Sequence, residues 1–209
     1  MEFAETKVPG AWVFTPRQHA DDRGVFLEWL RASVLSDVIG HPLTVAQANN
    51  SISRKDVLRG IHYALVPPGQ AKYVYCSRGA LLDFVVDIRD GSPTFGVCDS
   101  VLLDDVDRRT MYVAEGIGHG FVALTDDASL TYLVSEPFNP EREFTISPND
   151  PDLAIDWGVA APILSDRDRD APTLAEAREL GQLPTWESCL ARYDALGTKI
   201  ASAHAPGGA

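Results

Sequence analysis

Three side chains of types that can carry chemistry lie within fourteen positions of the chain: Arg59, His62 and Lys72. An unperturbed imidazole titrates near ~6.5, so His62 can accept a proton at neutral pH. A guanidinium can hold an anionic group, and an ammonium can offset negative charge that develops on an oxygen. Together these groups suit the removal of a proton next to a carbonyl in a phosphorylated substrate. A plain hairpin with a few surface charges would carry the same residues.

Two short strands around a proline- and glycine-rich turn must position these side chains, one over 57–63 and one over 72–78. Further strand-like stretches recur at roughly 8–12-residue spacing, which is typical of a sandwich or barrel and not of alternating strands and helices. They cover 81–88, 99–103, 110–113, 120–124 and 129–134. The sequence therefore predicts a mainly β fold.

Helical signals are confined to the edges of this β region. A short helix is predicted over 31–39, ended by Gly40, and another over 186–196. The segment 173–180 is a clear case, because Thr173 can cap it, Glu176 lies three residues on and Gly181 stops it. We expect residues 1–172 to form the barrel and 173–209 a helical appendage of the same domain, with a frayed end over 201–209.

Composition narrows the class of protein. The chain has 209 residues, of which 45% are hydrophobic and 23% charged, as in ordinary globular proteins. No apolar run approaches the ~18 residues that a membrane span requires, and the N-terminus lacks the plan of a signal peptide. We expect a cytoplasmic protein with no membrane partner. A net charge of -12 argues against nucleic acid as a partner, although an arginine cluster can still hold one small anion.

The cysteines do not indicate a disulfide framework or a thiolate metal site. They are three in number, with no C-x-x-C spacing, and Cys76 is predicted to be a small core residue. A histidine metal centre is also disfavoured, because His62 has no second histidine at His-x-His spacing. His119 stands between two glycines that would let the backbone approach a ligand closely. No Walker loop, dinucleotide fingerprint or serine-nucleophile elbow is present.

Two further features could complete a proton-transfer site. The period of a strand places Leu130, Tyr132 and Val134 on one face, where the Tyr132 hydroxyl either bonds locally or projects into a lumen. A phenol of pKa near ~10 can donate a proton. The segment 164–170 holds three aspartates that could orient His62, or could form a solvated charged loop. The segment 21–24 is predicted to be a turn that leaves Arg23 exposed or facing a partner.

Ordered motifs over about residues 12 to 175 resemble the dTDP-4-dehydrorhamnose 3,5-epimerase family and its relatives in deoxysugar and antibiotic pathways. The motifs are Phe14–Glu28, Gln47–Asn49, Leu58–Tyr63, Pro67–Lys72, Arg78–Gly79, Val86–Gly96, Gly118–Phe121 and Leu164–Asp168.

The resemblance implies a cupin-type (jelly-roll) β-barrel that works as a homodimer without metal or other cofactor. It implies that His62 is the base, oriented by Asp168, that Tyr132 is the acid on the opposite face of the sugar, and that Lys72 lies near the C4 oxygen. It implies that some ligand contacts come from the partner subunit. The substrate-binding residues implied by the resemblance are Arg23, Phe26, Glu28, Gln47, Asn49, Arg59, His119, Phe138, Glu143 and Arg167.

The resemblance implies epimerisation of a dTDP-4-keto-6-deoxysugar at C3, C5 or both. The C4 ketone acidifies the neighbouring hydrogens, and reprotonation of the enolate from the other face inverts the centre. Phe138 stands where many 3,5-epimerases have a tyrosine, which leaves open the substrate and the number of centres inverted. The alternatives are a sugar-nucleotide-binding cupin without turnover, a metal-dependent cupin oxygenase and a related ketoisomerase.

Overall fold

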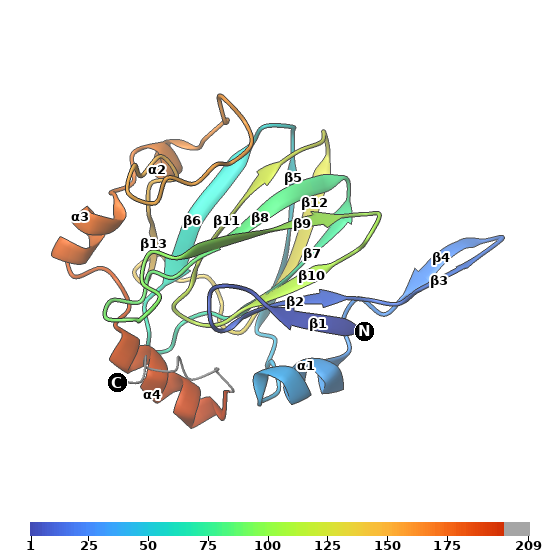
Figure 1. The fold of residues 1–209 in the computed structure, drawn as a ribbon, viewed down its shortest axis with the longest axis horizontal. Helices are drawn as coiled ribbons and strands as arrows, with labels where there is room; N and C mark the ends of the chain where they lie inside the picture. Colours follow the sequence, from blue (N-terminus) through green and yellow to red (C-terminus); the bar gives the residue numbers. More distant parts are fainter. Residues whose placement is uncertain (199–209) are drawn as a thin grey trace, which may run out of the picture.

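The computed structural model describes residues 1–198, whose body is a barrel of two antiparallel sheets (Figure 1). The six-stranded sheet has, in order, β1 (Glu2–Glu5), β2 (Ala11–Thr15), β10 (Thr110–Val113), β7 (Lys72–Arg78), β12 (Ala128–Val134) and β5 (Gln47–Ser53). The five-stranded sheet has β13 (Glu143–Thr145), β6 (Leu58–Ala64), β11 (Gly118–Ala123), β8 (Ala80–Val86) and β9 (Cys98–Asp104). The predicted mainly β fold is confirmed.

The two strands that carry the chemical motif, β6 and β7, are present but do not form a hairpin. Strand β6 pairs with β11 and β13, whereas β7 pairs with β10 and β12 in the other sheet. The connection over 65–71 contains Pro67 and Pro68, which have no N–H to donate to a ladder. The partners of β6 and β7 show that this connection crosses from one sheet to the other. The hairpin interpretation is wrong, and the crossing sets His62 and Lys72 on different walls of the barrel.

Within residues 1–198, four helices lie around the barrel: α1 (Ala32–Ile39), α2 (Asp166–Arg169), α3 (Leu174–Glu179) and α4 (Trp186–Leu196). The helices predicted over 31–39, 173–180 and 186–196 are confirmed. Helix α1 ends at Gly40, whose φ of 96° suits glycine. Helix α3 begins with the predicted capping box of Thr173 and Glu176.

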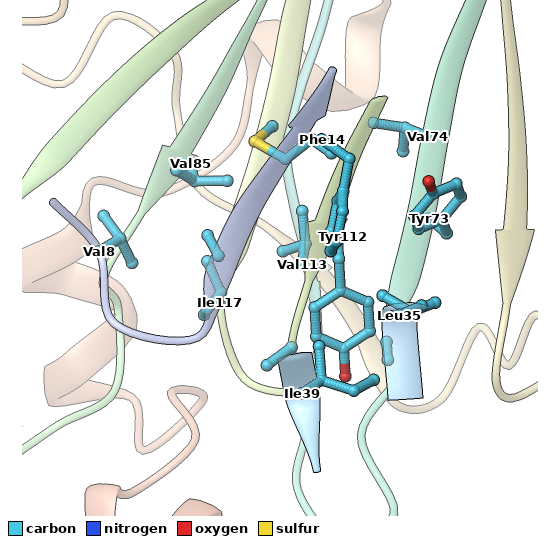
Figure 2. Packing of buried hydrophobic residues seen from close by; sticks show 14 of the residues in the cluster. Val8, Phe14, Leu35, Ile39, Tyr73, Val74, Val85, Tyr112, Val113 and Ile117 are labelled. Atoms are coloured by element: carbon cyan, nitrogen blue, oxygen red, sulfur yellow. The ribbon is translucent and has the colours of Figure 1, made fainter. Parts of the chain in front are cut away.

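The larger hydrophobic core lies within the barrel and extends to the faces of α1 and α4. Figure 2 shows Phe14, Tyr73 and Tyr112 from the six-stranded sheet packed with Leu35 and Ile39 of α1. Cys189 and Tyr193 of α4 belong to the same cluster, as does the buried Cys76. The prediction that Cys76 is a core residue is confirmed.

A second core cluster lies against the five-stranded sheet and includes residues of the C-terminal region. Leu174 and Ala177 of α3 pack there with Phe84, Ile61 and Trp157. The C-terminal helices therefore contribute to both core clusters, although the boundary at 172 and 173 stays a prediction. The tail predicted to fray, 201–209, lies outside the described residues.

A two-stranded arm of β3 (Gln18–Asp21) and β4 (Gly24–Leu27) projects away from the barrel (Figure 1). The turn predicted over 21–24 is confirmed at its tip, where the Arg23 side chain is 89% exposed and pairs with Asp21. Phe26 on the arm is 68% exposed. No helix in the described part of the chain is long and apolar enough to span a membrane.

Candidate active site

A cavity of about 460 Å³ lies between the two sheets and gathers most of the side chains singled out by sequence. Nine of its lining residues were predicted as site residues: Gln47, Asn49, Arg59, His62, Lys72, His119, Tyr132, Phe138 and Glu143. Four lining residues were not predicted: Ser51, Gln70, Phe121 and Leu130.

His62 on β6 has a buried carboxylate behind it. Its Nε2 lies 2.7 Å from Oδ1 of Asp168, which comes from α2 across a long stretch of sequence. Ser165 caps α2 by accepting a hydrogen bond from the Asp168 N–H. The Asp168 side chain is 4% exposed, whereas those of Asp166 and Asp170 are 88% and 67% exposed. Only the middle aspartate of the charged segment is therefore turned toward the histidine.

The pair is arranged so that His62 can act as a base near neutral pH. Burial lowers the pKa of His62 below its ordinary value, and the hydrogen bond to Asp168 offsets part of this effect. Burial alone would raise the pKa of Asp168, but hydrogen bonds from His62 and the Gly60 N–H bring it below its ordinary value. Asp168 is thus an acceptor, Nε2 carries a proton, and Nδ1 is the nitrogen left to receive one.

Glycines allow the two strands that carry the histidines to approach closely. A Cβ on Gly60 would lie 2.5 Å from Cα of Gly120, and Gly60 has a φ of +137°. No side chain fits at that distance, and only glycine adopts this φ readily. The glycines of the Arg-Gly-Ile-His and Gly-His-Gly-Phe motifs therefore bring His119 directly opposite His62 in the ladder of β6 and β11.

Tyr132 lines the cavity from the opposite sheet. It lies on β12 between Leu130 and Val134, and the cavity is lined by both Leu130 and Tyr132. The interpretation that the tyrosine faces a lumen fits this position. Burial raises the pKa of Tyr132, and the nearby Glu143 raises it further. The phenol therefore keeps its proton at neutral pH and can donate it.

Lys72, at the start of β7, is the most perturbed cation of the cavity. Burial lowers its pKa to about 8, although the carboxylates of Glu143 and Asp83 favour its charged form. The ammonium is therefore the major form of Lys72 at neutral pH, but it loses its proton more easily than an ordinary lysine does. A cation that is poorly solvated stabilises a developing oxyanion more than a surface lysine would.

Polar side chains of β5 and its neighbours line the rest of the cavity. Gln47, Asn49, Ser51 and Ser53 alternate with exposed residues along β5, as strand geometry requires. Ser53 accepts a hydrogen bond from Nε of Arg59 at 3.1 Å and so fixes the guanidinium. The Gln47 side chain donates to Oδ1 of Asn49 at 2.6 Å.

Phe138 and Glu143 line the cavity from the segment that follows β12. Phe138 is 54% exposed, and its N–H lies 3.4 Å from Oε1 of Gln47. Glu143 accepts hydrogen bonds from the Gln70 side chain and the Asn139 N–H. An exposed ring beside polar side chains is a surface on which a planar base could stack.

The structure does not bring four predicted substrate-binding residues into this cavity. Arg23 and Phe26 lie on the projecting arm, and Glu28 directly follows it. Arg167, on α2 beside Asp168, donates to the Glu143 carbonyl at 2.9 Å and lines a neighbouring hollow. Within residues 1–198, no three His, Cys, Asp or Glu side chains gather in a way that could hold a metal ion.

The arrangement can exchange a proton on one face of a bound molecule for a proton on the other. A neutral imidazole and a protonated phenol face the cavity from opposite sheets, and a desolvated ammonium is available for an oxyanion. These are the groups needed to form an enolate and to reprotonate it with inversion.

Comparisons with known proteins agree with this chemistry. A family model described as dTDP-4-dehydrorhamnose 3,5-epimerase matches residues 5–176. The chain is 55% identical over 190 residues to a dTDP-4-dehydrorhamnose 3,5-epimerase of Mycobacterium tuberculosis, and the match covers 90% of this chain and 94% of the relative. It is 54% identical over 184 residues to a dTDP-4-dehydrorhamnose 3-epimerase of Streptomyces niveus, and that match covers 88% of this chain and 89% of the relative. A solved 3'-monoepimerase from Streptomyces bikiniensis, in complex with dTDP-quinovose, is similar with a TM-score of 0.90 and 47% identity, covering 92% of this chain and 98% of that one.

Proposed function

Since the chain belongs to the dTDP-4-dehydrorhamnose 3,5-epimerase family and is an epimerase of dTDP-4-keto-6-deoxysugars, we propose that His62 and Tyr132 carry its two proton transfers. The observation that carries this proposal is their position on opposite walls of one cavity. Inversion at a carbon requires a base on one side of the sugar ring and an acid on the other.

In the proposed reaction, Nδ1 of His62 removes the proton from the carbon next to the C4 ketone. Asp168 keeps the proton on Nε2 and stabilises the imidazolium that forms, because a buried carboxylate favours the charged ring. The C–H electron pair moves into the ring to give a C4 enolate. The Tyr132 hydroxyl then protonates the same carbon from the opposite face, and solvent resets both groups.

Lys72 is proposed to stabilise the enolate oxygen. It reaches the cavity from β7, the strand next to the one that carries Tyr132. The charge on the oxygen exists in the transition state and not in the bound ketone, so an ammonium placed there favours the chemical step over substrate binding.

We propose that C3 is inverted in every turnover. The Mycobacterium tuberculosis relative is named as a 3,5-epimerase and the Streptomyces niveus relative as a 3-epimerase, so inversion at C3 is common to both names. Exchange of the C5 hydrogen with solvent will show whether C5 is inverted as well.

We further propose that the enzyme is a homodimer in which the β3–β4 arm completes the partner's site. All four residues of β3 are exposed, as are Val25 and Phe26 on β4, and an isolated hairpin is marginally stable in water. Arg59 and Lys72 are the cations among the described residues that line the cavity. A dTDP diphosphate requires more positive charge than Arg59 supplies if Lys72 serves the enolate, and Arg23 at the arm tip would provide it.

Mixed dimers test the exchange of arms. Subunits with Arg23→Ala and subunits with His62→Asn would be co-expressed under two affinity tags and purified as the heterodimer. If Arg23 acts across the interface, one site of each heterodimer has both its own His62 and the partner's Arg23, and activity returns to about half of the wild-type value. Activity no higher than that of the two single variants would contradict the exchange. A cytoplasmic location stays a prediction.

Exchange of substrate hydrogens with solvent tests the proposed proton transfers. With dTDP-4-keto-6-deoxyglucose in D₂O, the wild-type enzyme is expected to introduce deuterium at C3, and His62→Asn is expected to lose that exchange while still binding dTDP. Retained exchange in His62→Asn would contradict the role of His62.

A further inference from the structure

A second histidine–carboxylate pair lies beside the first. Nε2 of His119 lies 2.8 Å from Oδ1 of Asp83, a fully buried residue of β8. His119 is paired directly with His62 in the β6–β11 ladder, and both rings line the cavity. Each histidine thus bonds through Nε2 to a buried aspartate, and in the part of the chain that the structure describes neither Nδ1 has a hydrogen-bond partner.

We propose that Asp83 is a positioning residue that fixes His119 with its proton on Nε2. The inference rests on the proposed function, because it assigns Asp83 to the same reaction. With its proton on Nε2, the His119 ring presents Nδ1 to the sugar as a hydrogen-bond acceptor. A ring free to change tautomer would present an N–H in some of the molecules.

The burial of Asp83 is hard to explain by stability alone. Its side chain has no exposed surface, and Oδ2 has no hydrogen-bond partner within residues 1–198. A buried carboxylate with one unpaired oxygen is costly, and an apolar side chain at this position of β8 would avoid that cost. His119 is the group that Oδ1 of Asp83 contacts, so the carboxylate can serve the cavity through that histidine.

A double-mutant cycle tests the coupling to His119. Asp83→Asn, His119→Gln and the double variant would be compared for C3 exchange in D₂O. By analogy with carboxylates that orient metal-bound histidines, each single change is expected to lower kcat by about 10- to 100-fold. The rate of the double variant should lie within about threefold of the rate of the slower single variant, because both changes remove the same interaction. Multiplicative losses would overturn the coupling.

A matched control separates the effect of Asp83 from that of losing any carboxylate. Asp99→Asn on the neighbouring strand β9, whose carboxylate pairs with Lys7 near the surface, makes the same change and should leave the rate of C3 exchange unchanged. A loss in Asp99→Asn as large as that in Asp83→Asn would contradict the assignment.

The tautomer of His119 can be measured in the unaltered enzyme, so the test survives if Asp83→Asn fails to fold. In ¹⁵N-histidine NMR, assigned with His119→Gln, the wild-type protein should show His119 protonated on Nε2 alone. A Nδ1–H tautomer would overturn the proposal. Failure of the proposed function itself is distinguishable, because the wild-type enzyme would then show no exchange at C3 whatever the state of His119.

Discussion

Replacing Asp168 by Asn removes the charge behind His62 with almost no change in side-chain size. The two groups are 2.7 Å apart, and the Asp168 side chain is 4% exposed, so water cannot replace the lost charge easily. The imidazolium formed during proton abstraction would then face a neutral amide. We expect kcat to fall, whereas binding of dTDP should change little because Asp168 does not line the cavity.

The size of the effect follows from the interaction that is lost. A hydrogen bond to a charged group contributes about 1.5–3 kcal/mol, which corresponds to a loss of about 10- to 150-fold in rate. A rotated amide that donates to Nε2 would also favour the wrong tautomer of His62, a change that costs ~10⁴ in a serine-protease triad. We therefore expect kcat to fall at least about tenfold and to lie nearer a hundredfold below the wild type.

The assay is the initial rate of deuterium entry at C3 of dTDP-4-keto-6-deoxyglucose, followed by ¹H NMR in D₂O. Asp166→Asn is the matched control, because it makes the same change in the same helix at a side chain that is 88% exposed. It should have the wild-type rate. An Asp168→Asn rate equal to that of Asp166→Asn, with both proteins folded, would show that the Asp168 charge does not assist His62.

Three other predictions concern the acid, the pH dependence and the backbone. Tyr132→Phe should lower the rate of epimerised product by about 10²–10⁴-fold, measured by HPLC of the product, because no other group is proposed to protonate the opposite face. A smaller loss of epimerised product would exclude Tyr132 as the acid. The kcat/KM profile should rise with pH as His62 loses its proton, through a pKa below the ordinary ~6.5 of histidine. It should fall near pH 8, as Lys72 loses its proton. A rate still rising at pH 9 would contradict the role of Lys72. Gly60→Ala should lower the free energy of unfolding in urea by more than about 1–3 kcal/mol, because the φ of Gly60 is +137° and a Cβ would lie 2.5 Å from Gly120. Gly96→Ala is the control, because Gly96 has a φ of +82° with open space around it and carries only the backbone cost. Equal losses in the two variants would contradict the steric clash at Gly60.

Much of the barrel could be predicted because its strands follow local rules. The strands over 72–78, 99–103 and 110–113 are present with at most one residue of change at either end, and the capping box at Thr173 is formed as predicted. The family and the cupin-type barrel, implied by the ordered motifs, are confirmed as well.

Pairing between strands was the first thing that local sequence could not supply. The strands on either side of Pro67 and Pro68 were interpreted together as one structural unit, but they belong to opposite sheets. A segment rich in proline and glycine is compatible with a tight turn and with a crossing, and only the partners of each strand decide between them.

The carboxylate partners of His62 and His119 were the second feature that local sequence could not supply. Three aspartates over 166–170 are equivalent in composition, and the fold of α2 turns only Asp168 inward. Asp83 was not predicted because it lies in an apolar strand, 36 residues from His119, and carries no motif of its own. Gln70 and Ser51 were missed for the same reason, since their role depends on which walls meet across the cavity.

In the proposed reaction, one carbon of the sugar loses a proton to His62 and regains one from the opposite wall. Hydrogen exchange at C3 of dTDP-4-keto-6-deoxyglucose in D₂O tests both transfers at once, with wild-type enzyme and His62→Asn measured side by side. We expect deuterium at C3 in the epimerised product of the wild type and none with the variant. Epimerised product that keeps its original hydrogen at C3 would exclude proton exchange at this carbon.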